Sequence, residues 1–207
     1  MQIFFKQNLA LLAVPKTGST AYEMALKRRA DILFTGRRKH GTAVFFHRHV
    51  APFLEAAYKL TPERAAVIRD PLDHAKSWYR YRTRPEIRGT ANSTHAMSFD
   101  DFLDAAISDN PPPCAKVGSQ AGFLTMKDDV VPVHHLFAYE AQALFRGFLE
   151  ARFKRPLKLK EYNVSPVMQV TASREATARF REARAADFAL YDRVMQAGGH
   201  LQQVLDI

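Results

Sequence analysis

Hydrophobic residues in this chain gather in short continuous runs, and these runs alternate with stretches of helical spacing. The first run, residues 9–14, holds six apolar residues, which is typical of a strand buried on both faces of a parallel sheet. Further strands are predicted at residues 31–35, 43–46, 64–69 and 131–138 from their short apolar or β-branched patterns. The pattern therefore predicts several short strands distributed along the chain.

Helices are predicted between these strands. Their expected ranges are 21–29, 50–60, 71–82, 99–107, 139–153 and 173–196, the last as one or two helices. Ser98 is a suitable N-cap, and Pro71 suits the first turn of a helix. The segment Asn110-Pro111-Pro112-Pro113 must be a loop, because consecutive prolines cannot continue a helix.

Strands that alternate with helices indicate an α/β fold. We expect a three-layer architecture, with an open parallel sheet flanked by helices on both faces. A length of 207 residues predicts one domain, residues 1–207. Ligands of such sheets bind beyond the carboxyl ends of the strands, so the turns at the ends of the strands 9–14 and 64–69 are the places to search for a site.

The charge of the chain indicates an anionic partner. Lys and Arg number 30 against 21 Asp and Glu, which gives a net charge of +9. Nucleic acid, a phosphorylated cofactor, an acidic glycan and a membrane surface all fit this balance, and so does a basic surface that serves solubility alone. Basic residues are dense between residues 27 and 49.

Cysteine content and the apolar runs bear on location. The single cysteine, Cys114, excludes an intramolecular disulfide framework. The run at 9–14 is too short for a signal peptide, and no small-residue cleavage site follows it. No run approaches the roughly 18 residues of a membrane-spanning helix. These features predict a cytoplasmic protein without a membrane span.

The first candidate motif is Pro15-Lys16-Thr17-Gly18-Ser19-Thr20, between the first strand and the first helix. Gly18 allows a ligand to approach the backbone closely, and amides at a helix start attract anions. Lys16 adds a full charge, and Ser19 and Thr20 add hydroxyl donors. The segment predicts a phosphate-binding turn, although an ordinary strand–helix turn would show the same glycine.

The second candidate motif is Arg69-Asp70-Pro71, with Ser77 about two turns into the next helix. A guanidinium at a strand end and a hydroxyl on the helix can converge on one phosphate. The alternative is that Arg69 merely pairs with Asp73. Aromatic residues around both motifs are expected to be core rather than adenine-stacking residues, with Trp78 as the candidate exception.

Together the two motifs resemble those of sulfotransferases that use 3′-phosphoadenosine 5′-phosphosulfate. Residues 15–20 look like the 5′-phosphosulfate loop of that family, and Arg69-Asp70-Pro71 with Ser77 and Tyr79 resembles its 3′-phosphate motif. A weaker likeness lies in Asn163-Val164-Ser165-Pro166 and the C-terminal helix. His74 is a departure, because many members have a second arginine there.

The resemblance implies a role for each matching residue. Lys16, Thr17, Gly18, Ser19 and Thr20 would hold the 5′-phosphosulfate. Arg69 and Ser77 would hold the 3′-phosphate. The resemblance also implies a P-loop-like fold. The implied activity is sulfuryl transfer to a hydroxyl, with an acidic carbohydrate as the expected acceptor. Neither a metal nor a nucleic acid partner is expected.

A hydroxyl acceptor needs a base, and histidine titrates closest to neutral pH. His47-Arg48-His49 follows the strand predicted at 43–46 and resembles the His-x-His element of uronic-acid 2-O-sulfotransferases. The resemblance implies that His49 is the base and His47 a supporting group. Surface histidines or a metal pair would give the same pattern, and Glu23 or Glu55 is the alternative base.

Two other functions remain open from the sequence. A small-molecule kinase would also use a phosphate loop, but the lysine here precedes the glycine, unlike in G-x-x-x-x-G-K-[ST]. A non-catalytic binder of acidic glycan or nucleic acid would use the +9 charge alone.

Overall fold

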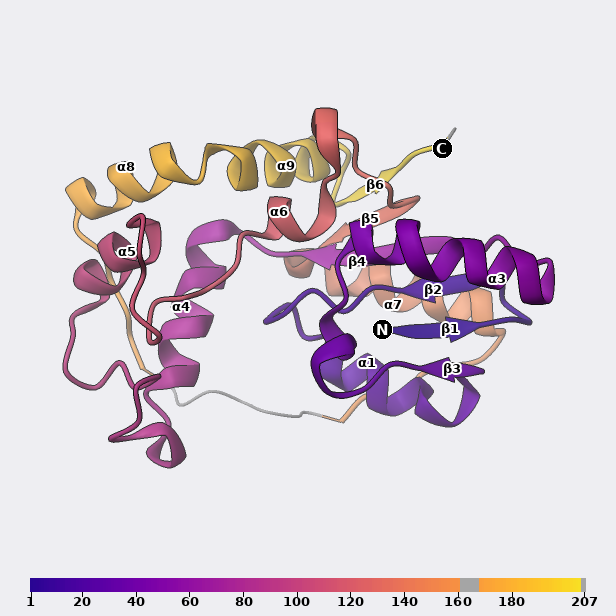
Figure 1. Ribbon diagram of the computed structural model, residues 1–207, viewed down its shortest axis with the longest axis horizontal. Helices are drawn as coiled ribbons and strands as arrows, with labels where there is room; N and C mark the ends of the chain where they lie inside the picture. Colours follow the sequence, from indigo (N-terminus) through magenta and orange to yellow (C-terminus); the bar gives the residue numbers. More distant parts are fainter. Residues whose placement is uncertain (161–167, 206–207) are drawn as a thin grey trace.

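The computed structural model describes residues 1–160 and 168–205. Within these residues, six strands form one open, mixed sheet in the order β3-β1-β2-β4-β5-β6. The strands are β1 (Gln2–Phe4), β2 (Leu9–Leu11), β3 (Ile32–Leu33), β4 (Glu63–Ile68), β5 (His135–Ala138) and β6 (His200–Gln202). The chain is therefore an α/β protein (Figure 1).

The centre of the sheet is parallel and its edges are antiparallel. Strand β2 pairs with β4 in parallel, and β4 pairs with β5 in parallel. Strands β1, β3 and β6 run antiparallel to their neighbours. The α/β prediction is confirmed, whereas an entirely parallel sheet is wrong. The cause is local, because a tight turn in which the Asn8 amide donates to the Phe5 carbonyl (3.0 Å) folds β1 back on β2 as a hairpin.

Helices connect the strands. They are α1 (Ser19–Leu26), α2 (Ala43–Phe45), α3 (Ala51–Tyr58), α4 (Pro71–Arg82), α5 (Phe99–Ile107), α6 (Gln120–Leu124), α7 (Gln142–Phe153), α8 (Arg174–Ala183) and α9 (Ala185–Gln196). Shorter turns are η1 (Lys27–Arg29), η2 (Gly36–His40), η3 (Phe46–Val50), η4 (Pro85–Ile87), η5 (Lys127–Asp129) and η6 (Tyr139–Ala141).

Helices with strong local signals match their predicted ranges. Ser98 caps α5 as predicted, and Asp101 completes a capping box with it. Pro71 opens α4, and the Asp70 carboxylate accepts from the Asp73 amide at 2.8 Å. The helical stretch after Ser173 divides into α8 and α9.

The strand predicted at residues 43–46 is wrong, because this segment is helical. The Thr42 hydroxyl caps α2 by accepting from the Phe45 amide, and α2 continues through the π-helical turn η3 into α3. The buried residues Ala43, Phe46, Val50 and Leu54 recur every three or four positions and join one core cluster. This is the spacing of a helix face. His47 and His49 consequently lie on helical turns and not at the end of a strand.

The two faces of the sheet carry separate cores. Ala10, Ala66 and Ile68 pack on one face with residues of α3, α6 and α9. Leu11, Ala65 and Val67 pack on the other face with residues of α1 and α7. Because side chains alternate between faces along a strand, the continuous apolar runs seen in the sequence supply both cores. The sheet thus lies between two layers of helices.

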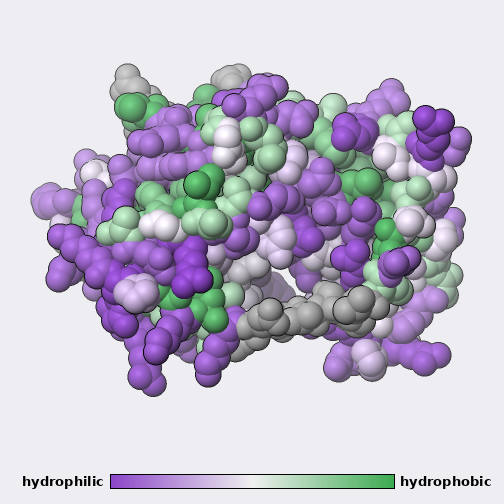
Figure 2. Space-filling model, turned by 180° about the vertical axis from the view of Figure 1, so that it is seen from behind, coloured by the Kyte–Doolittle hydropathy of each residue, from purple (hydrophilic) through white to green (hydrophobic). Residues whose placement is uncertain are grey.

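A third cluster packs beside the sheet. It joins Ala75 of α4, Phe102 of α5 and Phe180 of α8, among others. Figure 1 shows the turn after β2 pointing toward α4, at the carboxyl edge of the parallel strands. From behind, Figure 2 shows a hollow near the middle of the molecule with hydrophilic side chains around much of it. No helix in the described part of the chain is long and apolar enough to cross a membrane.

Candidate functional site

Three turns meet where the parallel strands end. They follow β2, β4 and β5, and these strands are neighbours in the sheet. The Arg69 guanidinium lies 4.3 Å from the centre of the Tyr139 ring, and the Asp70 amide donates to a Glu140 carboxylate oxygen at 3.2 Å. The turns after β4 and β5 are therefore in direct contact.

The turn after β2 leads into the amino end of α1. Gly18 is the N-cap of α1 with a φ of 73°, and it makes no side-chain capping bond. The Thr17 hydroxyl donates to the Val14 carbonyl at 2.9 Å, and Thr17 is 1% exposed. Thr17 thus shapes the turn, while Ser19 and Thr20 begin the helix. Amides at the positive end of a helix can bind an anion here.

Gly18 lies against the turn that follows β5. A Cβ at this position would be 3.0 Å from the Tyr139 ring, and the positive φ would also strain any other residue. Gly18→Ala is expected to lower the free energy of unfolding by about 2 kcal/mol, of which about 1 kcal/mol is backbone strain and about 1 kcal/mol is overpacking against Tyr139. Urea denaturation measures the difference.

The matched control is Gly89→Ala. Gly89 has a φ of 77°, and a Cβ there meets nothing within 4 Å. This variant should lose only the backbone contribution of about 1 kcal/mol. Equal losses in the two variants would contradict the close approach of Tyr139 to Gly18.

The Lys16 ammonium lies over aromatic rings of α4. Its Nζ is 4.2 Å from the centre of the Tyr81 ring and 5.7 Å from that of Trp78. Burial, together with the charges of Arg84 and Arg69, lowers the pKa of Lys16 to about 8. Lys16 is thus a partly desolvated cation beside two further cations. A bound anion would relieve their mutual repulsion.

Arg69 approaches the first turn. Its Nη1 donates to the Lys16 carbonyl at 3.5 Å, and its guanidinium stacks on Tyr139. Among the described residues, its buried Nε finds no hydrogen-bond partner. Asp73, the alternative partner considered from the sequence, pairs with Lys76 at 3.1 Å. The structure thus brings Arg69 and the loop at residues 15–20 together.

Helix α4 presents one side to the loop. The His74 Nε2–H donates to the Pro15 carbonyl at 3.0 Å, and burial lowers the pKa of His74 to about 4. His74 is therefore neutral near pH 7 and helps to hold the loop. Ser77 lies three residues after His74 and four before Tyr81, so all three share one helix face. Ser77 is 8% exposed, beside the residues that contact the loop.

His47 and His49 lie on the turn η3, between α2 and α3. Burial and the charges of Arg64 and Arg48 lower the pKa of His47. The His49 ring packs 5.4 Å from the centre of the Phe45 ring, and His49 is exposed. Residues 43–46 are fully described and form no strand. The sequence-based reason for expecting both histidines at the carboxyl edge of the sheet is therefore lost.

A different histidine contacts the strand–loop segment. The Nδ1 of His40, in η2, lies 2.7 Å from the Ala13 carbonyl. Because a carbonyl only accepts, Nδ1 carries the proton and the neutral ring has its lone pair on Nε2. Desolvation is the largest contribution that lowers the pKa of His40. The sequence pattern placed this residue in a basic loop and gave no signal of the contact.

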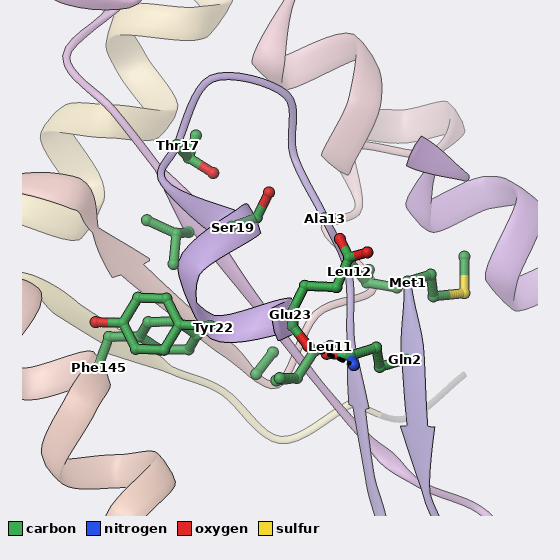
Figure 3. Close-up of a pocket in the computed structure, with 12 residues that line it drawn as sticks. Met1, Gln2, Leu11, Leu12, Ala13, Thr17, Ser19, Tyr22, Glu23 and Phe145 are labelled. Carbon is green, nitrogen blue, oxygen red and sulfur yellow. Dashed lines mark hydrogen bonds between the residues drawn. The ribbon is translucent and has the colours of Figure 1, made fainter. Parts of the chain in front are cut away.

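A small pocket lies between α1 and the sheet, next to the loop. Leu11, Tyr22, Val67 and Phe145 form much of its apolar wall. Figure 3 shows the Thr17 hydroxyl on the turn and the Ser19 hydroxyl at the start of α1, and Glu23 also lines the pocket. Glu23 pairs with Lys39 at 2.8 Å, and Glu55, the other acidic alternative, is exposed on α3.

The remaining expectations concern metals and the C-terminal likeness. Over residues 1–160 and 168–205, no three His, Cys, Asp or Glu side chains gather as metal ligands would. The segment Asn163-Val164-Ser165-Pro166 lies outside the described residues. Comparison with known proteins finds no family model, no curated protein and no solved structure that matches the chain.

Proposed function

We propose that this chain is a sulfotransferase that moves a sulfuryl group from 3′-phosphoadenosine 5′-phosphosulfate to a hydroxyl, with an acidic carbohydrate as acceptor. One observation carries the proposal. The amide-lined turn after β2 and the guanidinium of Arg69 meet at the carboxyl edge of the parallel strands, with Arg69 Nη1 3.5 Å from the Lys16 carbonyl. The three-layer arrangement around β2, β4 and β5 supports a P-loop-like fold.

The donor would span the two turns. Its 5′-phosphosulfate would lie on the amides of Gly18, Ser19 and Thr20 with Lys16 nearby, and Arg69 and Ser77 would bind its 3′-phosphate. Cations on both sides suit a ligand with charge at both ends of one nucleoside. This pairing favours a 3′-phosphorylated nucleotide over ATP, whose phosphates form one chain.

The reaction forms one S–O bond and breaks another. The acceptor oxygen attacks sulfur, the bond from sulfur to the bridging phosphate oxygen breaks, and the hydroxyl proton passes to a base. Negative charge develops on the departing phosphate oxygen. Lys16 and the turn amides can stabilise this charge because they are held in position before the reaction.

His40 is the base that the geometry supports best. Its Nδ1–H is engaged by the Ala13 carbonyl, so Nε2 can accept the proton. Its lowered pKa leaves the ring neutral near pH 7. Exposed Arg37 and Arg38 in the same turn η2 suit an acidic acceptor. That His49 is the base stays a prediction, although the strand expected before it is absent at residues 43–46.

The pH dependence of donor binding follows from Lys16. The affinity for 3′-phosphoadenosine 5′-phosphate should be greatest below about pH 8, where Lys16 is protonated, and should fall by up to about tenfold per pH unit above it. The nucleotide phosphates are already ionised there, since their second pKa is about 6. Calorimetric titration from pH 7 to 10 measures the decline.

Lys16→Arg is the control for this effect. Its guanidinium stays protonated throughout the range, so the decline should disappear in the variant. A wild-type affinity that does not change between pH 7 and 10 would refute the role of Lys16.

Thermal shift with a panel of nucleotides tests the proposed function. We expect 3′-phosphoadenosine 5′-phosphate to stabilise the protein and ADP or ATP with magnesium to have little effect. Incubation with a donor labelled in its sulfuryl group should then transfer the label to an acidic oligosaccharide. Equal stabilisation by ATP would favour a kinase. Salt-sensitive oligosaccharide binding without any nucleotide response would favour a non-catalytic binder.

A further inference from the structure

Gln120 holds the backbone of Arg69 through both of its polar groups. The Arg69 amide donates to Gln120 Oε1 at 2.9 Å, and Gln120 Nε2 donates to the Arg69 carbonyl at 2.8 Å. Gln120 is 2% exposed and begins α6, which is 51 residues away in the sequence. The side-chain amide therefore pairs with Arg69 as a neighbouring strand would.

A buried aspartate fixes the start of α6 in turn. Asp187 of α9 is 5% exposed, and its carboxylate accepts from the Ser119 hydroxyl at 2.8 Å and the Ala121 amide at 2.6 Å. These bonds lie on both sides of Gln120. Position and orientation of the Gln120 side chain are thus determined by α9 through α6.

The guanidinium of Arg69 needs this support because its own contacts are few. Its face rests on Tyr139, and Nη1 reaches the Lys16 carbonyl only at 3.5 Å. Its Nε has no hydrogen-bond partner within residues 1–160 and 168–205. Arg69 also directly follows β4, where the regular ladder of the strand ends. The two hydrogen bonds from Gln120 fix the backbone of Arg69, one residue beyond the end of β4.

We propose that Gln120 is a positioning residue that aims the Arg69 guanidinium at the 3′-phosphate of the donor. This inference rests on the proposed function, because it assumes that Arg69 binds that phosphate. Preorganised donors bind an anion without the entropic cost of ordering them first. Loss of the two bonds should therefore weaken recognition of the 3′-phosphate and leave recognition of the 5′ end intact.

Nucleotide titrations of Gln120→Met test the inference. The measured quantity is the affinity ratio of 3′-phosphoadenosine 5′-phosphate to adenosine 5′-phosphate, which isolates the 3′-phosphate. We expect this ratio to fall about tenfold in the variant, with the affinity for adenosine 5′-phosphate unchanged. A ratio equal to that of the wild type would overturn the inference.

Two further variants separate positioning from a merely structural role. Gly89→Ala should lower the melting temperature through backbone strain alone, while it leaves both Gln120 bonds and the affinity ratio in place. Gln120→Glu keeps the acceptor for the Arg69 amide and should retain a higher ratio than Gln120→Met; it also carries the test if Gln120→Met does not fold. An equal fall of the ratio in Gly89→Ala and the Gln120 variants would overturn the positioning role.

Failure of the proposed function gives a different result. In that case the wild-type protein itself would not prefer the 3′-phosphorylated nucleotide, whatever residue occupies position 120. A wild-type preference that survives in both Gln120 variants would reject the positioning role alone.

Discussion

Replacing Lys16 with methionine is expected to slow sulfuryl transfer by about 10²–10³-fold at saturating donor, because one preorganised donor is worth about 3–4 kcal/mol in the transition state. Methionine keeps much of the apolar stem that packs over Tyr81 and Trp78. The substitution therefore removes the charge with little change in packing. Single-turnover measurements with labelled donor separate the chemical step from binding.

Lys76→Met is the matched control. Lys76 lies on α4 and pairs with Asp73, so its loss lowers the net charge of the same region by one. This variant should retain the wild-type transfer rate within a factor of about three, because a partly exposed pair of this kind contributes little. A similar loss of rate in both variants would mean that the overall positive field, and not the position of Lys16, drives the reaction.

His40→Gln is expected to lower kcat by about 10²–10⁴-fold, the usual contribution of a general base. Glutamine can still donate to the Ala13 carbonyl, which His40 contacts in the structure, but it cannot take up a proton. Binding of 3′-phosphoadenosine 5′-phosphate should be unchanged, because the role proposed for His40 involves the acceptor and not the donor.

The pH profile gives a second measure of the role of His40. In the wild type, kcat should rise with pH through a pKa below the usual histidine value, since desolvation disfavours the protonated ring. That rise should be absent in the residual activity of His40→Gln. His49→Gln and Glu23→Gln are the comparison variants. If His49→Gln loses activity and His40→Gln keeps it, His49 is the base and the assignment of His40 is wrong.

Elements with local signals could be predicted from the sequence. The cap at Ser98 and the Asp70-Pro71 start of α4 act on residues within one turn, so the pattern alone identifies both helices. Strand β4 was recognisable because its apolar run supplies both sheet faces. The loop at residues 15–20 was recognisable because it joins a buried apolar run to a helix start.

Other features depend on contacts between distant parts of the chain. Residues 43–46 suit a strand by composition, but Phe46, Val50 and Leu54 bury one helix face against the sheet, and tertiary packing overrides the local preference. Strands β1 and β6 are three residues long and pair antiparallel, which a short pattern does not reveal. His40 meets Ala13 across 27 residues, and Gln120 meets Arg69 across 51, so neither contact has a local signature.

In the proposed site, two turns bind opposite ends of one nucleotide. Calorimetric titration of three ligands against three proteins tests this arrangement. The ligands are 3′-phosphoadenosine 5′-phosphate, adenosine 5′-phosphate and adenosine 3′-phosphate, and the proteins are the wild type, Lys16→Met and Arg69→Ala. Each single-phosphate ligand reports on one turn alone.

We expect each variant to weaken a different pair of ligands. Arg69→Ala should weaken the two ligands that carry a 3′-phosphate by at least tenfold and spare adenosine 5′-phosphate, and Lys16→Met should weaken the two that carry a 5′-phosphate and spare adenosine 3′-phosphate. If both variants weaken all three ligands alike, or if the wild type gains nothing from the second phosphate, the two turns do not hold one nucleotide between them.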